Sequence, residues 1–470
     1  MSLLAEQFEV LEQTTAPELR GTVSEVRGLA LRVAGLPVPI GAMVRIDPRS
    51  ARMNEASEKS DGLPGEVVGF DREYAIVMPL GAVAGVRPGD DVVAVQHAQQ
   101  VRVGESLLGR VLDGFGRPID GGGPLLDTAP RPLHPSPVDP MDRPVIEQPL
   151  ATGVRAVDAM ISLGRGQRLG VFAAPGVGKS TLLGGIAKHT AADVSVIALV
   201  GERGREVRDF IDNVLGPEGL KRSVVVCATS DEPALLRLRA AMVATSVAEY
   251  FRDQGKDVLL VMDSVTRFCQ AQRQIGLAAG EPPATRGYPP SVFSMLPTLL
   301  ERSGSTNAGS ITGLYAVLVE GDDMDEPIAD ACRGVLDGHV LLSRQLAEQG
   351  HYPAIDVLGS ISRVANDVTS KEHQAARREV LKLVSSYRQV EELLNIGAYA
   401  QGSNADFDLA IACKPAIDQL LQQGGSEVRG RADFQTTQAQ LFALTQQIQQ
   451  QRKQLNQAPQ QRRPVQGPRG

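Results

Sequence analysis

A glycine-rich segment near the middle of the chain has the residue types of a phosphate-binding loop. It reads AAPGVGKS over residues 173–180, between an apolar run and the helix-like stretch TLLGGIAKH. Gly176 and Gly178 let the backbone curl so that successive N–H groups point at one phosphate, and the next helix adds its positive N-terminal end. Lys179 offers a compact charge to the β- and γ-phosphates, and Ser180 offers a hydroxyl to Mg²⁺. The segment therefore predicts a nucleoside triphosphate site.

Two acidic residues follow apolar runs that have the length of strands. Asp263 ends the run in DVLLVMDSVTRF (257–268), and Glu202 follows the run that leads into VGERGREVRDF (200–210). The carboxyl ends of parallel strands are where an α/β sheet binds its ligand. We expect Asp263 to bind Mg²⁺, because a phosphate loop precedes it in the chain. Glu202 could polarise an attacking water, or it could be a solvated charge at the end of a strand.

A fourth segment, HYPAIDVLGSISR (351–363), carries an aromatic ring and a cation. Tyr352, which precedes Pro353, could stack on an adenine face. Arg363 could stabilise the charge on a transferring phosphoryl group, because its planar guanidinium stays charged. Taken alone, an arginine in this position is more often a surface residue.

The elements that must position these residues alternate between strands and helices. Helical stretches such as residues 234–255 separate the apolar runs, and this alternation predicts an α/β fold with a parallel sheet. The expected strands lie at 168–174, 194–200, 224–228, 258–262 and 313–319.

The flanking regions differ in texture. Residues 20–96 contain short β signals at close spacing, which predict a small closed or sandwiched β domain. Residues 121–149 carry a proline every few positions and should form an extended linker or strap. Residues 371–423 have a helical pattern, and the Gln-rich stretch 446–470 should be a frayed helix that runs into a disordered tail.

Composition excludes several function classes. The chain has 470 residues, which suggests roughly three domains, and its net charge is −7. Aromatic residues make up 4% and tryptophan is absent, so neither bulk charge nor stacking favours binding to nucleic acid. We expect no membrane-spanning helix and no signal peptide. We also expect reduced, buried thiols for the four cysteines, which are Cys227, Cys269, Cys332 and Cys413.

Together and in this order, the segments resemble one family closely, the export ATPases of flagella and of type III secretion injectisomes. Both groups are similar to the catalytic subunit of rotary ATP synthases. The resemblance covers about residues 20–425. The phrases that carry it are GRVLDGFGRPID (109–120), APGVGKS (174–180), GERGREV (201–207), MDSVTRF (262–268), TRGYPPSVFSMLPTLLERSG (285–304), LVEGDDMDEPIAD (318–330), RGVLDGHVLLSR (333–344) and HYPAIDVLGSISR (351–363).

The resemblance implies a role for each candidate residue. Glu202 would position the water, and Arg203 would lie near the γ-phosphate. Arg363 would be an arginine finger that reaches the nucleotide of the neighbouring subunit. Ser180 and Asp263 would hold Mg²⁺. The residues that bind ATP would be Gly176, Val177, Gly178, Lys179, Ser180, Thr181 and Tyr352.

The resemblance also implies the architecture. We expect an α/β fold with a RecA-type P-loop nucleotide domain, an N-terminal β-barrel and a C-terminal helical domain. The expected divisions are 1–19 for an amphipathic segment, 20–96 for the barrel, 97–365 for the ATPase domain, 366–440 for the helical domain and 441–470 for a Gln-rich, disordered tail.

The resemblance further implies where the chain would work and with what. The family ring is a homohexamer at the cytoplasmic face of the inner membrane, beside the export gate. Its partners are regulatory and stalk proteins and chaperone–cargo complexes, with no specific nucleic acid. The acidic loop at 321–327 resembles the segment that faces a central stalk, so Asp322, Asp323 and Asp325 would contact a stalk protein; a solvated acidic turn is the alternative.

Three features depart from the family pattern or fall outside it. Ala173 and Pro175 are unusual neighbours of the phosphate loop, although Pro175 precedes the first phosphate-binding glycine and need not donate a hydrogen bond. The tail beyond about residue 440 lies outside the match. The opening segment has Leu4, Phe8 and Leu11 at helical spacing with Glu6, Glu9 and Glu12, so we expect either a helix that docks on a partner or a frayed terminus.

Several alternatives remain open. Phrases such as RGVLDGH (333–339) favour a flagellar over an injectisome ATPase. A nucleic-acid motor of RecA type is disfavoured by charge and composition, and a non-catalytic ring subunit is disfavoured by Glu202. A synthase catalytic subunit would need a different partner chain.

Overall fold

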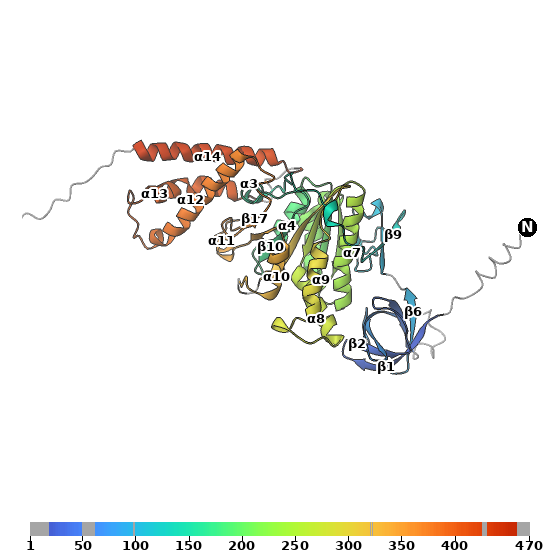
Figure 1. The fold of residues 1–470 in the computed structure, drawn as a ribbon. Helices are drawn as coiled ribbons and strands as arrows, with labels where there is room; N and C mark the ends of the chain where they lie inside the picture. Colours follow the sequence, from blue (N-terminus) through green and yellow to red (C-terminus); the bar gives the residue numbers. More distant parts are fainter. Residues whose placement is uncertain are drawn as a thin grey trace, which may run out of the picture.

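The computed structural model describes residues 18–48, 62–96, 99–319, 321, 323–424 and 430–457. Three units follow one another along the molecule: a barrel at one end, a central sheet flanked by helices, and a helical unit at the other end (Figure 1). Of the sequence expectations, the N-terminal helix with Leu4, Phe8 and Leu11 lies outside the described residues.

The N-terminal unit is a closed barrel of six antiparallel strands, in the order β1-β2-β5-β4-β3-β6. Closure removes the unpaired strand edges that an open sheet of this size would expose. Alternate residues point inward, and Leu31, Val33, Val44 and Val77 are among the fully buried ones. The strands are β1 (Arg20–Arg27), β2 (Ala30–Ala34), β3 (Met43–Asp47), β4 (Leu63–Asp71), β5 (Tyr74–Pro79) and β6 (Asp91–Gln96).

The central sheet confirms the expected α/β fold. Its order is β17-β16-β10-β15-β13-β11-β12-β8, with β14 beside β15, and all pairs are parallel except β16–β17 and β14–β15. The strands are β8 (Val111–Leu112), β10 (Arg168–Ala173), β11 (Val194–Val200), β12 (Ser223–Ala228), β13 (Asp257–Asp263), β14 (Gly304–Ser305), β15 (Ser310–Leu318), β16 (Gly338–Leu341) and β17 (Ile361–Ser362).

Helices cover both faces of this sheet, which explains why its strands are continuous apolar runs. Along β11, Ile197 and Leu199 belong to one buried cluster, whereas Val196 and Ala198 belong to the other. The first cluster includes α3 (Arg155–Met160) and α4 (Lys179–His189), and the second includes α7 (Ala234–Asp253), α8 (Val265–Ala278), α9 (Pro290–Leu300) and α10 (Pro327–Val335). The shorter helices are α5 (Gly204–Asp209), a π-helical turn at Phe210–Leu215, α6 (Gly216–Leu220) and α11 (Arg344–Glu348).

The proline-rich segment 121–149 is a strap laid over the nucleotide domain. Within it β9 (Ala129–Pro132) pairs with β7 (Gln100–Val103). Further along, the guanidinium of Arg143 donates a hydrogen bond of 2.9 Å to the carbonyl of Ser303. Of the two forms expected from the sequence, linker or strap, the segment therefore takes the second.

The C-terminal unit contains α12 (Lys371–Asn395), α13 (Ala405–Leu421) and α14 (Phe434–Gln457). The expectation of a disordered tail from residue 441 is wrong for residues 441–457, because α14 continues unbroken to Gln457. The reason is a buried apolar face: Leu441, Leu444 and Ile448 pack into the core that α12 and α13 share. Polar residues dominate the composition of this stretch and hide that spacing.

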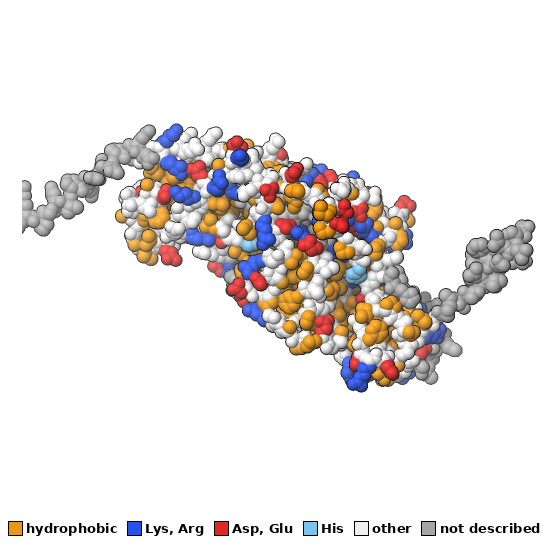
Figure 2. Space-filling model, in the orientation of Figure 1, with side chains coloured by type: hydrophobic (Ala, Val, Ile, Leu, Met, Phe, Trp, Pro, Cys, Tyr) orange, Lys and Arg blue, Asp and Glu red, His pale blue; other side chains and the backbone are white. Residues whose placement is uncertain are grey.

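The surface carries charges of both signs. On the face shown in Figure 2, hydrophobic side chains gather over the barrel and the neighbouring part of the nucleotide domain, and basic and acidic side chains are intermixed over the remainder. No helix in the described part of the chain has the length and apolar character needed to span a membrane.

Candidate active site

The loop after β10 has the backbone shape that a phosphate requires. Gly176 and Gly178 have φ of 84° and 91°, in the left-handed region that favours glycine. Gly178 caps α4, so the N-terminal end of this 11-residue helix opens directly onto the loop. Gly176 has open space beside it, where a bound phosphate group could approach the backbone closely.

Three charged side chains meet at the carboxyl edge of the sheet. Asp263 is the last residue of β13, and Glu202 follows β11, the strand beside it. The ammonium of Lys179, the first residue of α4, forms an ion pair with the Asp263 carboxylate and lies 3.9 Å from Glu202 Oε1. The Lys179 and Asp263 side chains are only 9% and 2% exposed. Because little water can solvate them, each charge is stabilised by the other.

The surroundings of Glu202 suit it to proton transfer. Burial and the charge of Asp263 raise the pKa of Glu202 to about 7 from an ordinary 4.5, although the Lys179 ammonium acts in the opposite direction. Glu206, in the first turn of α5, adds to the rise in the pKa of Glu202 through a hydrogen bond. A carboxyl whose pKa lies near neutral pH can accept a proton from water in its ionised form.

The oxygen atoms needed for Mg²⁺ are close together. Ser180 Oγ lies 3.5 Å from Asp263 Oδ2, so one hydroxyl and one carboxylate face the phosphate loop. Within the described residues, no group of three or more His, Cys, Asp or Glu side chains could hold a metal alone. Mg²⁺ does not require such a group, because it keeps several waters and shares the phosphates of its nucleotide. The residues therefore fit Mg²⁺ bound together with a triphosphate.

A cavity of about 550 Å³ continues from the phosphate loop toward the C-terminal helices. The ring of Tyr352, which is 48% exposed, lies 3.7 Å from the position that a Cβ on Gly178 would occupy. An aromatic face beside an apolar wall suits a nucleobase. The cavity is lined by Val177 and Thr181, two of the residues predicted to bind ATP, and by residues that sequence reasoning did not find, among them Val154, Asn213, Pro353 and Gln423.

Arg203 and two described acidic residues of the 321–327 loop pair with residues other than Lys179 and Asp263. Arg203 is exposed at the start of α5 and pairs with Glu206 at 3.4 Å. In the acidic loop, Asp323 pairs with Arg286 at 2.9 Å and Asp325 with Arg333 at 3.5 Å, and Asp322 lies outside the described residues. Arg203, Asp323 and Asp325 therefore each have an intramolecular partner.

Arg363 lies near the amino ends of the parallel strands, whereas the phosphate loop of its own chain lies at their carboxyl ends. Its backbone N–H donates to Asp337, whose N–H donates to Arg168 at the start of β10. Lys179, by contrast, follows the end of β10. The six residues of β10 span about 20 Å, so the exposed Arg363 cannot reach its own site.

Family models match most of the same region. The nucleotide-binding domain of the ATP synthase alpha/beta family matches residues 153–362, and the T3SS EscN ATPase C-terminal domain matches residues 369–443. The two models therefore cover the sheet except for β8, the phosphate loop and most of the C-terminal helical unit.

Curated relatives and solved structures are similar over nearly the whole chain. The flagellum-specific ATP synthase of Bacillus subtilis is 49% identical, covering 89% of this chain and 94% of its own. The type 3 secretion system ATPase of Xanthomonas euvesicatoria is 50% identical, with 86% and 89% covered. The assembled ATPase EscN of enteropathogenic E. coli superposes with a TM-score of 0.83 at 42% identity, with 90% and 100% covered. EscN has also been solved in complex with its central stalk EscO.

Proposed function

The chain belongs to the family of flagellum-specific and type III secretion ATPases, and on that premise we propose that it hydrolyses ATP to drive export of flagellar proteins. The observation that carries the chemistry is the meeting of Lys179, Asp263 and Glu202 at the end of the phosphate loop. Three of the relatives named for flagella share 48–49% identity with the chain. An injectisome ATPase is the alternative, since a secretion-system relative is 50% identical.

In the proposed reaction each group has one task. The loop N–H groups and Lys179 hold the β- and γ-phosphates. Glu202 orients a water and accepts its proton as the water oxygen bonds to the γ-phosphorus, while the bond from that phosphorus to the bridging oxygen of ADP breaks. Tyr352 covers one face of the adenine. Mg²⁺, when bound with ATP, would be held by Ser180 and Asp263 and would neutralise phosphate charge.

Each site needs a second copy of the chain to complete it. Arg363 is exposed and too far from its own loop, so it can stabilise the developing charge only on the nucleotide of a neighbouring copy. This geometry, together with the similarity to an assembled relative, supports a closed homo-oligomer, for which we propose a hexamer. Arg203, exposed beside Glu206, would turn toward the γ-phosphate when nucleotide binds.

The proposed partners follow from the same relatives. A central stalk protein would contact the loop at 321–327, and Asp323 and Asp325 would then exchange their present arginine partners for basic groups of the stalk. EscN, a relative, is described in complex with such a stalk. We also propose that regulatory proteins and chaperone–cargo complexes bind the ring at the cytoplasmic face of the inner membrane, beside the export gate.

The experiment that tests the proposed function measures ATP hydrolysis against protein concentration, with and without Mg²⁺. We expect Mg²⁺-dependent hydrolysis whose rate per chain rises steeply with concentration, because neighbours complete each site. A chain without ATPase activity at any concentration would refute the proposal. An ATPase that RNA stimulates and salt strongly weakens would instead favour a nucleic-acid motor.

A further inference from the structure

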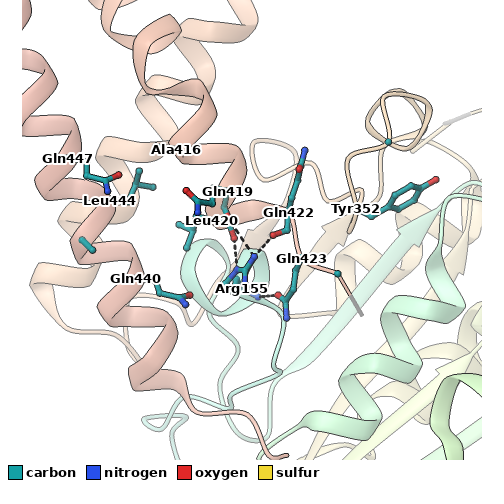
Figure 3. A pocket seen from close by; sticks show the side chains of 13 residues that line it. Arg155, Tyr352, Ala416, Gln419, Leu420, Gln422, Gln423, Gln440, Leu444 and Gln447 are labelled. Atoms are coloured by element: carbon teal, nitrogen blue, oxygen red, sulfur yellow. Dashed lines mark hydrogen bonds between the residues drawn. The ribbon is translucent and has the colours of Figure 1, made fainter. Parts of the chain in front are cut away.

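The end of α13 is fastened to the loop that precedes α3. The guanidinium of Arg155, the first residue of α3, donates hydrogen bonds to backbone carbonyls at the C-terminal end of α13 (Figure 3). A cation at this position satisfies carbonyls that lack partners within the helix and complements its negative end. The carbonyls belong to Gln419, Leu420 and Gln422.

Gln423, two residues beyond α13, makes a second connection, in which its own side chain bonds to backbone groups of the loop. Its Oε1 accepts a hydrogen bond of 2.8 Å from the backbone N–H of Arg155, and its Nε2 donates one of 2.7 Å to the carbonyl of Gly153. One amide side chain therefore spans both ends of the short loop Gly153–Arg155. The buried carboxylate of Asp158 holds the same loop from its other side, through the N–H groups of Thr152 and Gly153.

Gln423 also holds the second wall of the base cavity. Its backbone N–H donates a hydrogen bond of 2.9 Å to the carbonyl of Tyr352. Next to it, the Gln422 amide donates to Nδ1 of His351 at 3.2 Å, so two consecutive residues of the C-terminal unit hold the Tyr352 loop. Both loops line the 550 Å³ cavity beside the phosphate loop.

We infer that Gln423 is a positioning residue for the nucleobase and links the C-terminal helical unit to ATP affinity. The inference rests on the proposed ATPase function. Gln423 fixes the distance between the Val154 wall and the Tyr352 wall, and it is covalently continuous with α13. A movement of α13 relative to the sheet must therefore move both walls, and by linkage a bound base must favour one position of α13.

This placement separates the base from the phosphates. The phosphate loop is held by β10 and α4, and neither contacts Gln423 through a hydrogen bond in the described residues. Loss of the Gln423 amide should therefore weaken binding of the base while the triphosphate contacts remain. Two hydrogen bonds at ordinary net strength correspond to about a tenfold change in affinity.

The test compares Gln423→Ala with wild type at a protein concentration where the ring is assembled. We expect KM for ATP, and the Kd of a fluorescent ATP analogue, to rise about tenfold, with kcat changed less than about twofold. Inhibition by inorganic tripolyphosphate, which reaches only the phosphate loop, should be unchanged. That last readout distinguishes positioning of the base from general loss of structure.

Gln419→Ala is the matched control. Gln419 lies on the same helix end and lines the neighbouring cavity, but only its backbone carbonyl is used, so its affinity for ATP should equal that of wild type. Gln423→Glu is the second variant if Gln423→Ala does not fold. It keeps an acceptor for Arg155 but places an oxygen against the Gly153 carbonyl, and it should also raise the Kd.

Two results would overturn the inference: a Gln423 variant with wild-type affinity for ATP, or one that loses tripolyphosphate and ATP affinity in parallel. The rate of hydrolysis by wild type tests the proposed function separately. The ratio of the two binding constants tests Gln423 even in a chain that turns over slowly.

Discussion

In the proposed reaction Glu202 accepts the proton of the attacking water, a task that the Lys179–Asp263 pair cannot perform. Lys179 and Asp263 satisfy each other's charge, whereas Glu202 is 3.9 Å from the ammonium and shifted toward neutral pKa. Of the two carboxylates, Glu202 is the one without a close ion pair to Lys179. A nearly isosteric substitution can therefore test its proposed function as the base.

The variant Glu202→Gln should bind ATP and hydrolyse it poorly. The amide keeps the size and the hydrogen bonding of the side chain but cannot accept a proton, so we expect kcat to fall about 10²–10⁴-fold with little change in the Kd of an ATP analogue. Glu218→Gln, an exposed change in α6, is the control and should leave kcat unaltered. Undiminished hydrolysis by the first variant would assign the base to another residue.

At this scale the sequence identifies residues whose types are diagnostic. Lys179, Ser180 and Asp263 could be predicted, because a glycine loop between a strand and a helix and an acid at a strand end are both set by local pattern. Gln423 and Arg155 could not, because a glutamine in a Gln-rich stretch carries no signal. Their importance comes from tertiary contacts between positions more than 260 residues apart.

Among the elements, α14 shows how burial overrides composition. Its Gln-rich sequence suggests solvation, yet Leu441, Leu444 and Ile448 form one stripe that faces α12 and α13. An ion pair of 2.9 Å between Arg452 and Glu379 of α12 continues the contact toward the end of the helix. The helix is therefore part of the folded C-terminal unit.

Truncation of a core side chain tests this. Ile448→Ala should destabilise the C-terminal unit by about 2–5 kcal/mol, because it removes buried methyl groups and leaves a cavity. Chemical denaturation followed by circular dichroism measures the change. Gln449→Ala, on the exposed side of the same turn, should alter stability by less than about 0.5 kcal/mol. Equal effects of both variants would mean that α14 is not docked as described.

The contact between the barrel and the nucleotide domain contains a pH-sensitive group. Glu66 of β4 faces Gln99 and Arg239, and burial raises its pKa to about 7 from 4.5 against the effect of both partners. The folded state therefore binds this proton more tightly than the unfolded state. Its contribution to stability is present below pH 4.5 and is lost as pH rises to about 7.

The substitution Glu66→Gln should remove the loss of stability that Glu66 causes as the pH rises. We expect the variant to unfold at a higher temperature than wild type at pH 8 but not at pH 4.5, with a difference in free energy of about 1–3 kcal/mol. Glu73→Gln, in the exposed turn between β4 and β5, serves as the control. A stability difference that does not depend on pH would show that the pKa of Glu66 is the same in the folded and unfolded states.

For the whole molecule, the order of textures along the chain predicts the three units, since barrel, sheet and helical bundle each have their own hydrophobic period. Two features of the structure could not be predicted from these sequence patterns. The burial of α14 depends on a partner surface made by α12, α13 and α3. The separation of Arg363 from its own phosphate loop depends on the antiparallel pairing of β17, a two-residue strand too short to give a signal.

Because Arg363 is separated from the phosphate loop of its own chain, we propose that each nucleotide site is divided between two copies of the chain. Lys179→Ala removes the loop's cation but leaves the finger, and Arg363→Ala does the reverse. Alone, Arg363→Ala should still bind nucleotide and lose about 10³–10⁵-fold in turnover. Lys179→Ala should lose both binding and turnover.

The most direct test mixes these two inactive variants under conditions where subunits exchange, and measures ATP hydrolysis. Pairing an intact loop with an intact finger should restore activity well above the sum of the separate variants, up to roughly a quarter of wild type if sites act independently in an equal mixture. A mixture that remains at that sum would contradict a shared site.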